Sequence, residues 1–318
     1  MSRARALELP PEERSTLRRA RRLEWLTIAY LVSAIVLLAL VLSNSQAMKT
    51  AWAEDILSLI PPLAFLIATK FNVRPPTDRF PYGFHRVTSI GHLCSALALF
   101  TMGAYLLFDA LHGLITAEYP TIGSIELFGQ SLWLGWLMLP ALAWSALPAV
   151  FLGRAKMPLA EQLHNKVLYA DAKMNKADWL TAGAAMVGIV GIGFGLWWAD
   201  SAAAALISLD ILKDGAQNLR RAVADLMDET PTTVDRDATD PVRDELLSML
   251  KGLDWVEGAE VRLREEGQVY FGEAFVVSSD SANLTQNIED ASKKARALDW
   301  RVQDLVIMPV RKLPDQGG

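Results

Sequence analysis

Four side chains that can bind a cation share one face of a predicted helix in the second half of the chain. The segment YADAKMNKAD holds them: Asp171, Met174, Asn175 and Asp178. At about 3.6 residues per turn, their spacing places all four on the same side. The charge-free run that follows, Trp179–Ala199, is long enough to cross a bilayer. Since a carboxylate inside a membrane helix costs roughly 2.5–3.5 kcal/mol on insertion scales, the pattern predicts an intramembrane cation site.

Composition indicates a membrane part joined to a polar domain, because 52% of the 318 residues are hydrophobic. The single cysteine, Cys94, excludes an intrachain disulfide. The four histidines are scattered, which argues against a His-rich metal-buffering loop. Seven arginines in the first 22 residues could bind nucleic acid, but a hydrophobic helix follows at once, so we interpret them as a topology signal and expect no nucleic-acid partner. Trp25–Leu42 is longer than the hydrophobic core of a usual signal peptide and lacks a clear cleavage site, so we do not interpret it as a signal peptide.

The hydrophobic runs predict six transmembrane helices. They are about Trp25–Ser43, Trp52–Thr69, Val87–Leu114, Leu127–Gly153, Val167–Trp198, and Ser201 onward to Asp214. The second begins with Glu54 and Asp55 and contains Pro61 and Pro62. Because proline lacks an N–H and clashes with the preceding turn, this helix should break locally. The break is a hinge, a source of an extra carbonyl ligand, or an ordinary kink.

Asp210, Lys213 and Asp214 stand at i, i+3 and i+4 near the end of the sixth helix. One interpretation is an ion cluster that neutralises itself at the cytoplasmic end. The alternative is a second polar step along the ion or proton path.

Loop charges predict the orientation. Basic residues follow the second and fourth helices: Lys70, Arg74, Arg79, Arg86, Arg154, Lys156 and Lys166. The opposite loops offer Lys49 alone, with Glu118 and Glu126. The positive-inside rule then places both termini in the cytoplasm of a multi-pass protein of the cell (inner) membrane, with the lipid bilayer as a partner.

From about Asp240 the pattern changes to a small soluble domain. The expected elements are a helix over Asp240–Leu253, strands at Ala259–Arg264 and Gln268–Ser278, a helix from Leu284 to about Leu298 behind Asn283, and a strand over Arg301–Val310. Helix, strand, strand, helix, strand predicts a two-layer α+β domain of ferredoxin-like type. The predicted divisions are a basic N-terminal segment 1–23, a membrane domain 24–227, a linker 228–240, a dimerisation domain 241–310 and a tail 311–318.

Six helices followed by an α-β-β-α-β tail resemble the cation diffusion facilitator (cation efflux) family over about residues 24–310. The run RPPTDRFPYG, Arg74–Gly83, is similar to the family's loop after the second helix, which usually ends His-Pro-Tyr-Gly-His-Gly-Arg. Here Phe80 and Phe84 replace its histidines. Asp109 lies where a family acidic residue ends the third helix, and Asp200 follows Asp178 by 22 residues, as in the family.

The resemblance implies a tetrahedral metal quartet on the second and fifth helices, built from Asp-x-x-x-Asp (or His-x-x-x-Asp) and His-x-x-x-Asp. The corresponding positions are Glu54, Ser58, Met174 and Asp178. Asp178 matches outright and Glu54 is a conservative change, whereas Ser58 and Met174 depart from the pattern. A rotation by one residue offers Asp55 and Asn175 instead.

The ligand chemistry is mostly oxygen. Zinc favours sites rich in His and Cys, whereas carboxylate, amide and hydroxyl oxygens suit manganese, magnesium or ferrous iron better. Coordination by Met174 would favour a softer ion. We therefore expect a transported divalent cation of the manganese, iron, zinc or cobalt class and no cofactor.

Each candidate also has an ordinary structural interpretation. Asp178 could pair with Lys173 or Lys176, and whichever of Glu54 and Asp55 is not a ligand could face the outer cavity.

The remaining candidates divide in the same way. Asp171 near the cytoplasmic end is either a ligand or a solvated residue of the entry funnel. Met174 could pack in the core, and Ser58 could hydrogen-bond its own backbone.

The function implied by the resemblance is divalent-cation efflux by alternating access, coupled to proton entry, in a homodimer formed through the tail; it is not an enzyme. The tail contains no His or Cys, so no strong metal site is expected there. One alternative is a degenerate, non-transporting structural or regulatory homologue. Another is a transporter of a different cation such as sodium or magnesium.

Overall fold

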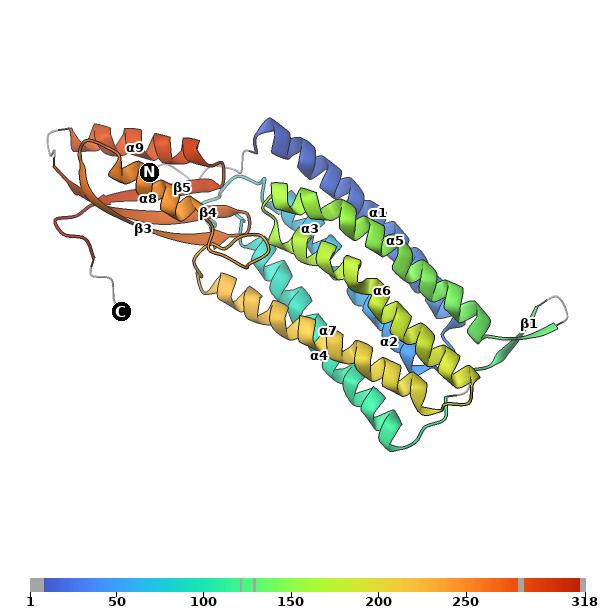
Figure 1. Cartoon of the computed structure of the whole chain (residues 1–318). Coiled ribbons are helices and arrows are strands. Elements are labelled where there is room, and N and C mark those ends of the chain that lie inside the picture. The colour runs from blue at the N-terminus through green and yellow to red at the C-terminus, as the bar shows by residue number, and fades with distance from the viewer. Residues whose placement is uncertain (1–8, 121, 128–129, 280–282, 315–318) are drawn as a thin grey trace.

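A helical bundle and a small α+β domain lie end to end in the computed structural model, which describes residues 9–120, 122–127, 130–279 and 283–314 (Figure 1). The bundle consists of α1 (Pro11–Val41), α2 (Gln46–Leu57), α3 (Ile60–Phe71), α4 (Val87–Ile115), α5 (Gly135–Gln162), α6 (Lys166–Gly193) and α7 (Trp198–Leu226). Its core is aliphatic and methionine-rich, around residues such as Met48, Met138 and Ile207.

Four helical stretches of the described residues are long and apolar enough to cross a membrane: α1, α2 together with α3, α4 and α5. α6 and α7 are of similar length, with 28 and 29 residues, and they carry charged side chains such as Asp178 and Asp210 well inside the helix. Large apolar side chains such as Leu40, Phe108 and Leu206 are exposed on the bundle surface. An exposed apolar surface of this kind is what a bilayer would cover.

The ends of the first and fourth predicted helices differ from the structure. α1 begins at Pro11, so the helix includes most of the basic N-terminal segment. α5 begins at Gly135 instead of Leu127, because Ser124–Leu127 (β1) and Gln130–Trp133 (β2) form an antiparallel hairpin. Hydropathy alone cannot separate a short apolar strand from the start of a helix.

The second predicted helix is broken, as its two prolines indicate. α2 ends at Leu57 and α3 starts at Ile60. Pro61 and Pro62 have no N–H to donate to the carbonyls of Leu57 and Ser58 four residues earlier, so a regular helix cannot continue.

The turn between α6 and α7 comes earlier than predicted. α6 ends at Gly193 instead of Trp198, and Gly195 adopts a φ of +79°, which favours glycine. The charge-free run Trp179–Ala199 therefore contains this turn and the start of α7.

Asp200 at the start of α7 holds the start of α2. Its carboxylate accepts hydrogen bonds from the Ser45 hydroxyl (2.6 Å) and from the backbone N–H groups of Gln46 (2.5 Å) and Ala47 (3.2 Å). A carboxylate at a helix N-terminus satisfies unpaired N–H groups and complements the helix dipole. Asp200 thus joins α7 to the helix that carries Glu54 and Asp55.

α4 and α7 approach closely through glycines. A Cβ at Gly103 of α4 would lie 2.7 Å from the backbone nitrogen of Leu212, and one at Gly215 of α7 would lie 2.5 Å from that of Phe100. Small residues allow two helix backbones to come into contact in this way. The two helices are therefore antiparallel neighbours in a fixed register.

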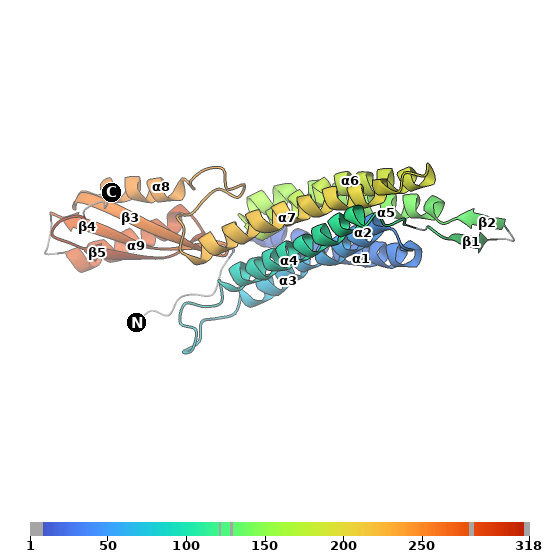
Figure 2. The same ribbon diagram turned by 90° about the horizontal axis from the view of Figure 1, so that it is seen from below.

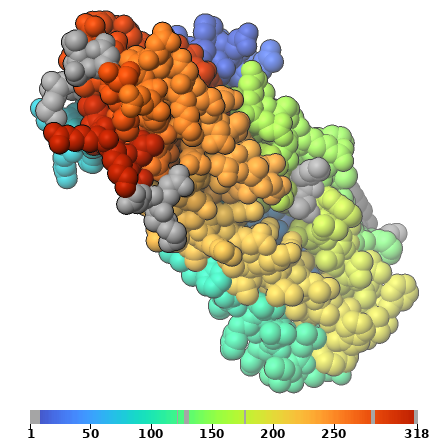
Figure 3. Space-filling model, turned by 60° about the vertical axis from the view of Figure 1, so that its left-hand side comes forward, coloured from blue at the N-terminus to red at the C-terminus, as the bar shows by residue number. Residues whose placement is uncertain are grey.

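The C-terminal domain has the predicted order of elements: α8 (Val242–Lys251), β3 (Val256–Glu266), β4 (Val269–Ser278), α9 (Leu284–Leu298) and β5 (Val302–Pro309). β4 is central, antiparallel to β3 and parallel to β5. Its core joins both helices to the sheet through residues such as Leu246, Ala295 and Val276. The domain lies beyond the bundle end opposite the β1–β2 hairpin (Figure 2), and the two parts form a continuous surface (Figure 3).

Candidate metal-transport site

The predicted site residues lie on two helices that contact each other. Glu54 and Asp55 stand in the last turn of α2, and Ser58 caps that helix. Asp171, Met174, Asn175 and Asp178 follow along α6. α2 and α6 are in direct contact, so the two sets face the same part of the bundle.

Three carboxylates from these helices interact electrostatically. Glu54 lies within range of both Asp55 and Asp178, and Asp55 and Asp178 interact with each other. Among the described residues, no group of three or more His, Cys, Asp or Glu side chains is close enough together to hold a metal ion. The carboxylates thus gather in one region without forming a closed coordination sphere.

The neighbouring acids Glu54 and Asp55 have different partners. Asp55 is 9% exposed and accepts hydrogen bonds from the Ser145 hydroxyl of α5 at 3.0 and 2.8 Å. Glu54 instead lies next to Thr181 and Asp178 of α6. Because one residue rotates a helix by about 100°, the two carboxylates face different helices.

Ser145 was not predicted as a site residue, because it belongs to a segment without charge. Its backbone carbonyl accepts a hydrogen bond from the Tyr30 hydroxyl of α1. Asp55, Ser145 and Tyr30 therefore link α2, α5 and α1.

Asp171 belongs to a buried ion network and is not a solvated funnel residue. Lys156 of α5 lies 2.5 Å from Asp171 Oδ2 and 2.9 Å from Glu24 Oε2 of α1. Lys156 and Glu24 are fully buried and Asp171 is 2% exposed. Asn175 donates a hydrogen bond to Asp171 at 3.4 Å. Asp171 thus has a cationic partner of its own, within electrostatic range of Asp178.

The sequence-based interpretation placed Lys156 in a cytoplasmic loop, and that was wrong. α5 continues past Gly153 to Gln162, so Lys156 lies inside the helix. Glu24 is the first residue of the predicted membrane domain and was not singled out as a candidate. The available signal for Glu24 was its position as a single acidic residue at the edge of an apolar run. Such a residue needs a partner when the run is buried.

The neutral candidates have structural roles. Met174 packs against the aliphatic core of the bundle. Ser58 is buried, and its backbone N–H donates to the Glu54 carbonyl at 2.8 Å. The carbonyls of Leu57 and Ser58, to which the two prolines cannot donate a hydrogen bond, lie one turn beyond Glu54.

The polar residues of α7 continue toward this region. Asp210 is exposed and within electrostatic range of Glu54, and Asp214 interacts with Asp210. Within the described part of the chain, Lys213 makes no ion pair with either acid. The predicted cluster of Asp210, Lys213 and Asp214 is therefore not held together by direct ion pairs among the described residues.

The comparison with known proteins identifies the family. The family model described as the cation efflux transmembrane domain matches residues 25–227. The chain belongs to the cation efflux family. Members of this family are transporters and not enzymes.

Two relatives are similar over more than half of this chain. The manganese efflux system protein MneS of Bacillus subtilis is 28% identical over 199 residues, covering 60% of this chain and 64% of that protein. Mitochondrial metal transporter 2 of Saccharomyces cerevisiae is 25% identical over 235 residues, covering 69% of this chain and 49% of the relative. A human protein named a probable proton-coupled zinc antiporter matches a shorter region, 29% identical over 86 residues, or 27% of this chain and 20% of its own. The matched regions thus span less than two thirds of these relatives' lengths.

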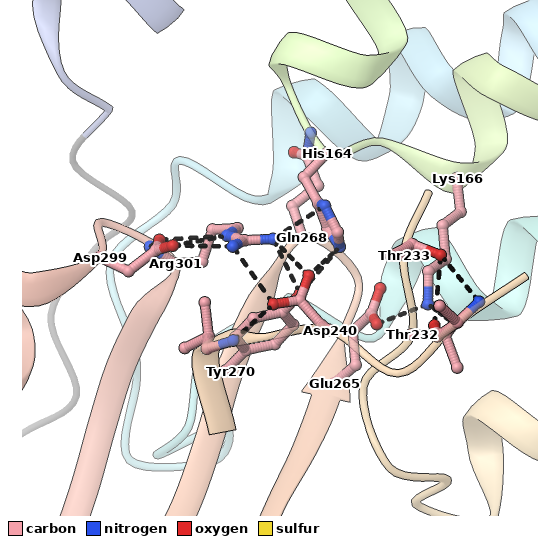
Figure 4. Close-up of polar contacts among 12 residues, drawn as sticks. His164, Lys166, Thr232, Thr233, Asp240, Glu265, Gln268, Tyr270, Asp299 and Arg301 are labelled. Carbon is pink, nitrogen blue, oxygen red and sulfur yellow. Dashed lines mark hydrogen bonds and ion pairs between the residues drawn. The ribbon is translucent and has the colours of Figure 1, made fainter. Parts of the chain in front are cut away.

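In this cation efflux protein, a polar network joins the α5–α6 turn to the C-terminal domain (Figure 4). Arg301 donates to His164 Nδ1 at 2.8 Å and to Asp240 at 2.8 Å. The Tyr270 hydroxyl lies 2.8 Å from His164 Nε2 and donates to Asp240 at 2.9 Å. Since Nδ1 accepts from a guanidinium, His164 is neutral, with its proton on Nε2.

The electrostatics of the network agree with this assignment. Burial, followed by the nearby Arg301 charge, lowers the pKa of His164 to about 4. Burial alone would raise the pKa of Asp240, but hydrogen bonding to the Val242 N–H and the Arg301 charge outweigh it and lower that pKa. The cation efflux domain is therefore connected to its C-terminal domain through a neutral histidine beside an ion pair.

Proposed function

We propose that this chain exports a divalent cation from the cytoplasm in exchange for protons, with the cation bound between α2 and α6. The observation that supports this most directly is the grouping of Glu54, Asp55 and Asp178 in the same region of a membrane domain. Like charges brought together in a medium of low dielectric repel one another, and a bound cation would remove that repulsion.

The donors favour manganese over zinc as the cargo. The proposed ligands are Glu54, Asp55 and Asp178, with Asn175, the Ser58 hydroxyl and the carbonyls beside it as neutral oxygen donors. Oxygen-rich sites suit manganese, whereas zinc prefers His and Cys. The manganese efflux protein among the relatives agrees with this choice. We assign Met174 to packing and Asp171 to the ion network that borders the site.

Transport would proceed by alternating access. In the inward state the carboxylates bind the cation, and in the outward state they release it and accept protons, which return to the cytoplasm. The proline break between α2 and α3 lets the segment that carries Glu54 and Asp55 move relative to α3. This motion would bring the α2 and α6 ligands closer together than they are in the structure described here.

The proposed topology has six crossings: α1, the α2–α3 pair, α4, α5, α6 and α7. The loop charges support a cytoplasmic position for both termini and for the C-terminal domain. We propose that two copies associate through that domain in the cell (inner) membrane.

Ion flux into proteoliposomes tests the proposal. Manganese, iron, zinc, cobalt, cadmium and magnesium are offered separately while internal pH is followed, for wild type, Asp178→Ala and Glu54→Gln. Glu118→Ala, which removes an exposed carboxylate on the hairpin side of the bundle, is the matched control. We expect saturable manganese flux with opposite proton movement, lost in Asp178→Ala, reduced at least tenfold in Glu54→Gln and kept in the control.

Two results would contradict the proposal. Flux that persists in Asp178→Ala would place the cation elsewhere. An absence of flux for every metal, from folded and inserted wild type, would instead support a non-transporting homologue.

A further inference from the structure

A pocket of about 290 Å³ lies between the end of α7 and the loop that follows it. Its polar lining consists of Gln217, Arg220, Arg221, Glu229, Thr232 and Arg236. At about 30 Å³ per water, this volume holds roughly ten water molecules, which is ample for a phosphate group.

The loop after α7 is ordered and holds one of these arginines in place. Thr232 pairs with Thr239 across the loop in an antiparallel bridge. Arg236 has a φ of 64°, in the left-handed region that is unusual for a residue with a side chain. Its guanidinium forms a two-pronged ion pair with Asp225 of α7, at 2.9 and 2.6 Å. The segment expected to be a polar linker thus folds back to complete the pocket wall.

The other two arginines of the pocket differ from Arg236 in their surroundings. Arg220 and Arg221 make no ion pair with any described residue, and Glu229 is the one carboxylate that lines the pocket. Asp225 is taken up by Arg236, and the nearby Asp235 and Asp237 are exposed outside the pocket. With Arg236 neutralised by Asp225, the two remaining guanidinium groups against one lining carboxylate leave an excess of one positive charge. A guanidinium presents a planar fork of donors that matches phosphate oxygens.

The height of the pocket along the bundle fits the lipid headgroups. Because Gly103 faces Leu212 and Gly215 faces Phe100, the register places Arg221 opposite a residue near Cys94 of α4. With the middle of α4 set at the bilayer centre, Arg221 lies about seven residues, or roughly 10 Å, from that centre. The hydrocarbon core has a half-thickness of about 15 Å, and a long arginine side chain extends from this depth to the headgroups.

We propose that the arginine pocket binds a phosphate group at the membrane surface on the side of the C-terminal domain. The same chemistry would accept the headgroup of an anionic phospholipid or a soluble phosphate compound. The proposal does not depend on the transport function, because none of its residues belongs to the proposed cation site.

Two binding experiments on the full chain distinguish the sources. In the first, protein in nanodiscs of phosphatidylcholine with added phosphatidylglycerol is released into the gas phase, and retained lipid is measured by native mass spectrometry. In the second, detergent-solubilised protein is titrated with inorganic phosphate by calorimetry. Both use wild type, Arg220→Gln/Arg221→Gln, and Arg220→Lys/Arg221→Lys, which keeps the charge and hence the topology signal. Lys70→Gln/Arg74→Gln removes two basic residues at the same end of the bundle as a control.

Each basic residue near the surface contributes about fivefold to anionic-lipid binding, so the loss of general surface charge alone costs up to about 25-fold in both the glutamine variant and the control. A specific pocket should therefore show as a larger loss of retained phosphatidylglycerol in the glutamine variant than in the control. The lysine variant should lose less than the glutamine variant. Saturable phosphate binding without lipid retention, lost in the glutamine variant, would identify a soluble ligand. Equal lipid retention in the glutamine variant and the control, without phosphate binding, would overturn the proposal.

Discussion

Lys166 Nζ lies 2.6 Å from Glu265 Oε2, and both side chains are 7% exposed. Lys166 is the first residue of α6, and Glu265 is near the end of β3. Lys166 also donates to the Thr232 hydroxyl at 2.7 Å. The helix that carries Asp178 is therefore attached at its first residue to the sheet of the C-terminal domain.

Replacing Lys166 with methionine should loosen this attachment. The change leaves Glu265 buried without its counter-charge, and breaking a buried pair costs about 3–5 kcal/mol. We expect faster proteolysis of the 228–240 segment and faster hydrogen exchange in the β3–β4 turn. Lys293→Met is the control, because Lys293 forms a solvent-exposed ion pair in α9 that contributes little to stability. Equal protection in the two variants would show that the ion pair does not hold the domain in place.

The neutral His164 predicts a dependence of domain attachment on pH. Its folded-state pKa of about 4 lies below the ordinary value of 6.5, so the unfolded chain binds more protons between these values. By linkage, the stability that His164 contributes is lost as pH falls from about 6.5 to about 4. Burial raises the pKa of Glu265 to about 7, which has the opposite effect on stability.

Comparing wild type with His164→Gln isolates the histidine from Glu265. We expect the unfolding free energy of wild type, relative to the variant, to shrink as pH falls through this window. Denaturant unfolding at several pH values measures the difference. A difference that stays constant from pH 6.5 to pH 4 would rule out a neutral, buried histidine.

Lys156→Met should destabilise the bundle by about 3–5 kcal/mol, because it leaves Glu24 and Asp171 buried without a cation. Adding Glu24→Gln and Asp171→Asn to Lys156→Met removes the uncompensated charges and should restore part of the stability. Thermal unfolding in detergent provides the measurement. If the triple variant is less stable than Lys156→Met alone, loss of packing rather than loss of charge compensation dominates.

Gly215→Ala should push α4 and α7 apart. The new Cβ would lie 2.5 Å from the Phe100 nitrogen and 2.6 Å from its Cα, and backbone cannot yield as a flexible side chain does. Overpacking of this kind costs about 1–3 kcal/mol. Gly183→Ala in α6 is the matched control: its Cβ would meet nothing within 4 Å, so improved helix propensity should leave stability unchanged or raise it by up to about 1 kcal/mol. Equal melting temperatures for the two variants would contradict this close approach.

Short-range sequence patterns predicted the bounds of helices and strands well where a single signal dominated. The start of α4 at Val87 and the bounds of α9, Leu284–Leu298, are those that the sequence predicted. The β1–β2 hairpin was missed because Leu132 and Trp133 prolong an apolar run that also fits a helix. Alternation over four residues is too short to distinguish the two periods.

For the site, helical spacing predicted which residues share a face of α6, but it could not predict their partners. Asp171 was recognised, whereas Lys156 and Glu24 come from helices whose contacts depend on tertiary packing. The choice between Glu54 and Asp55 was open because it depends on the rotation of α2, which the Asp200 cap and the Ser145 contact help to fix. Whether these residues bind the cation stays a prediction.

The buried triad also has a consequence for the order of biosynthesis. Glu24 precedes its partner Lys156 by 132 positions. At about 5–20 residues per second, a ribosome needs roughly 7–26 s to cover that distance. Throughout this interval the Glu24 carboxylate lacks its partner Lys156. We therefore expect the charged end of the first helix to stay in water or in the insertion machinery. The triad is complete only after α5 has supplied Lys156 and α6 has supplied Asp171.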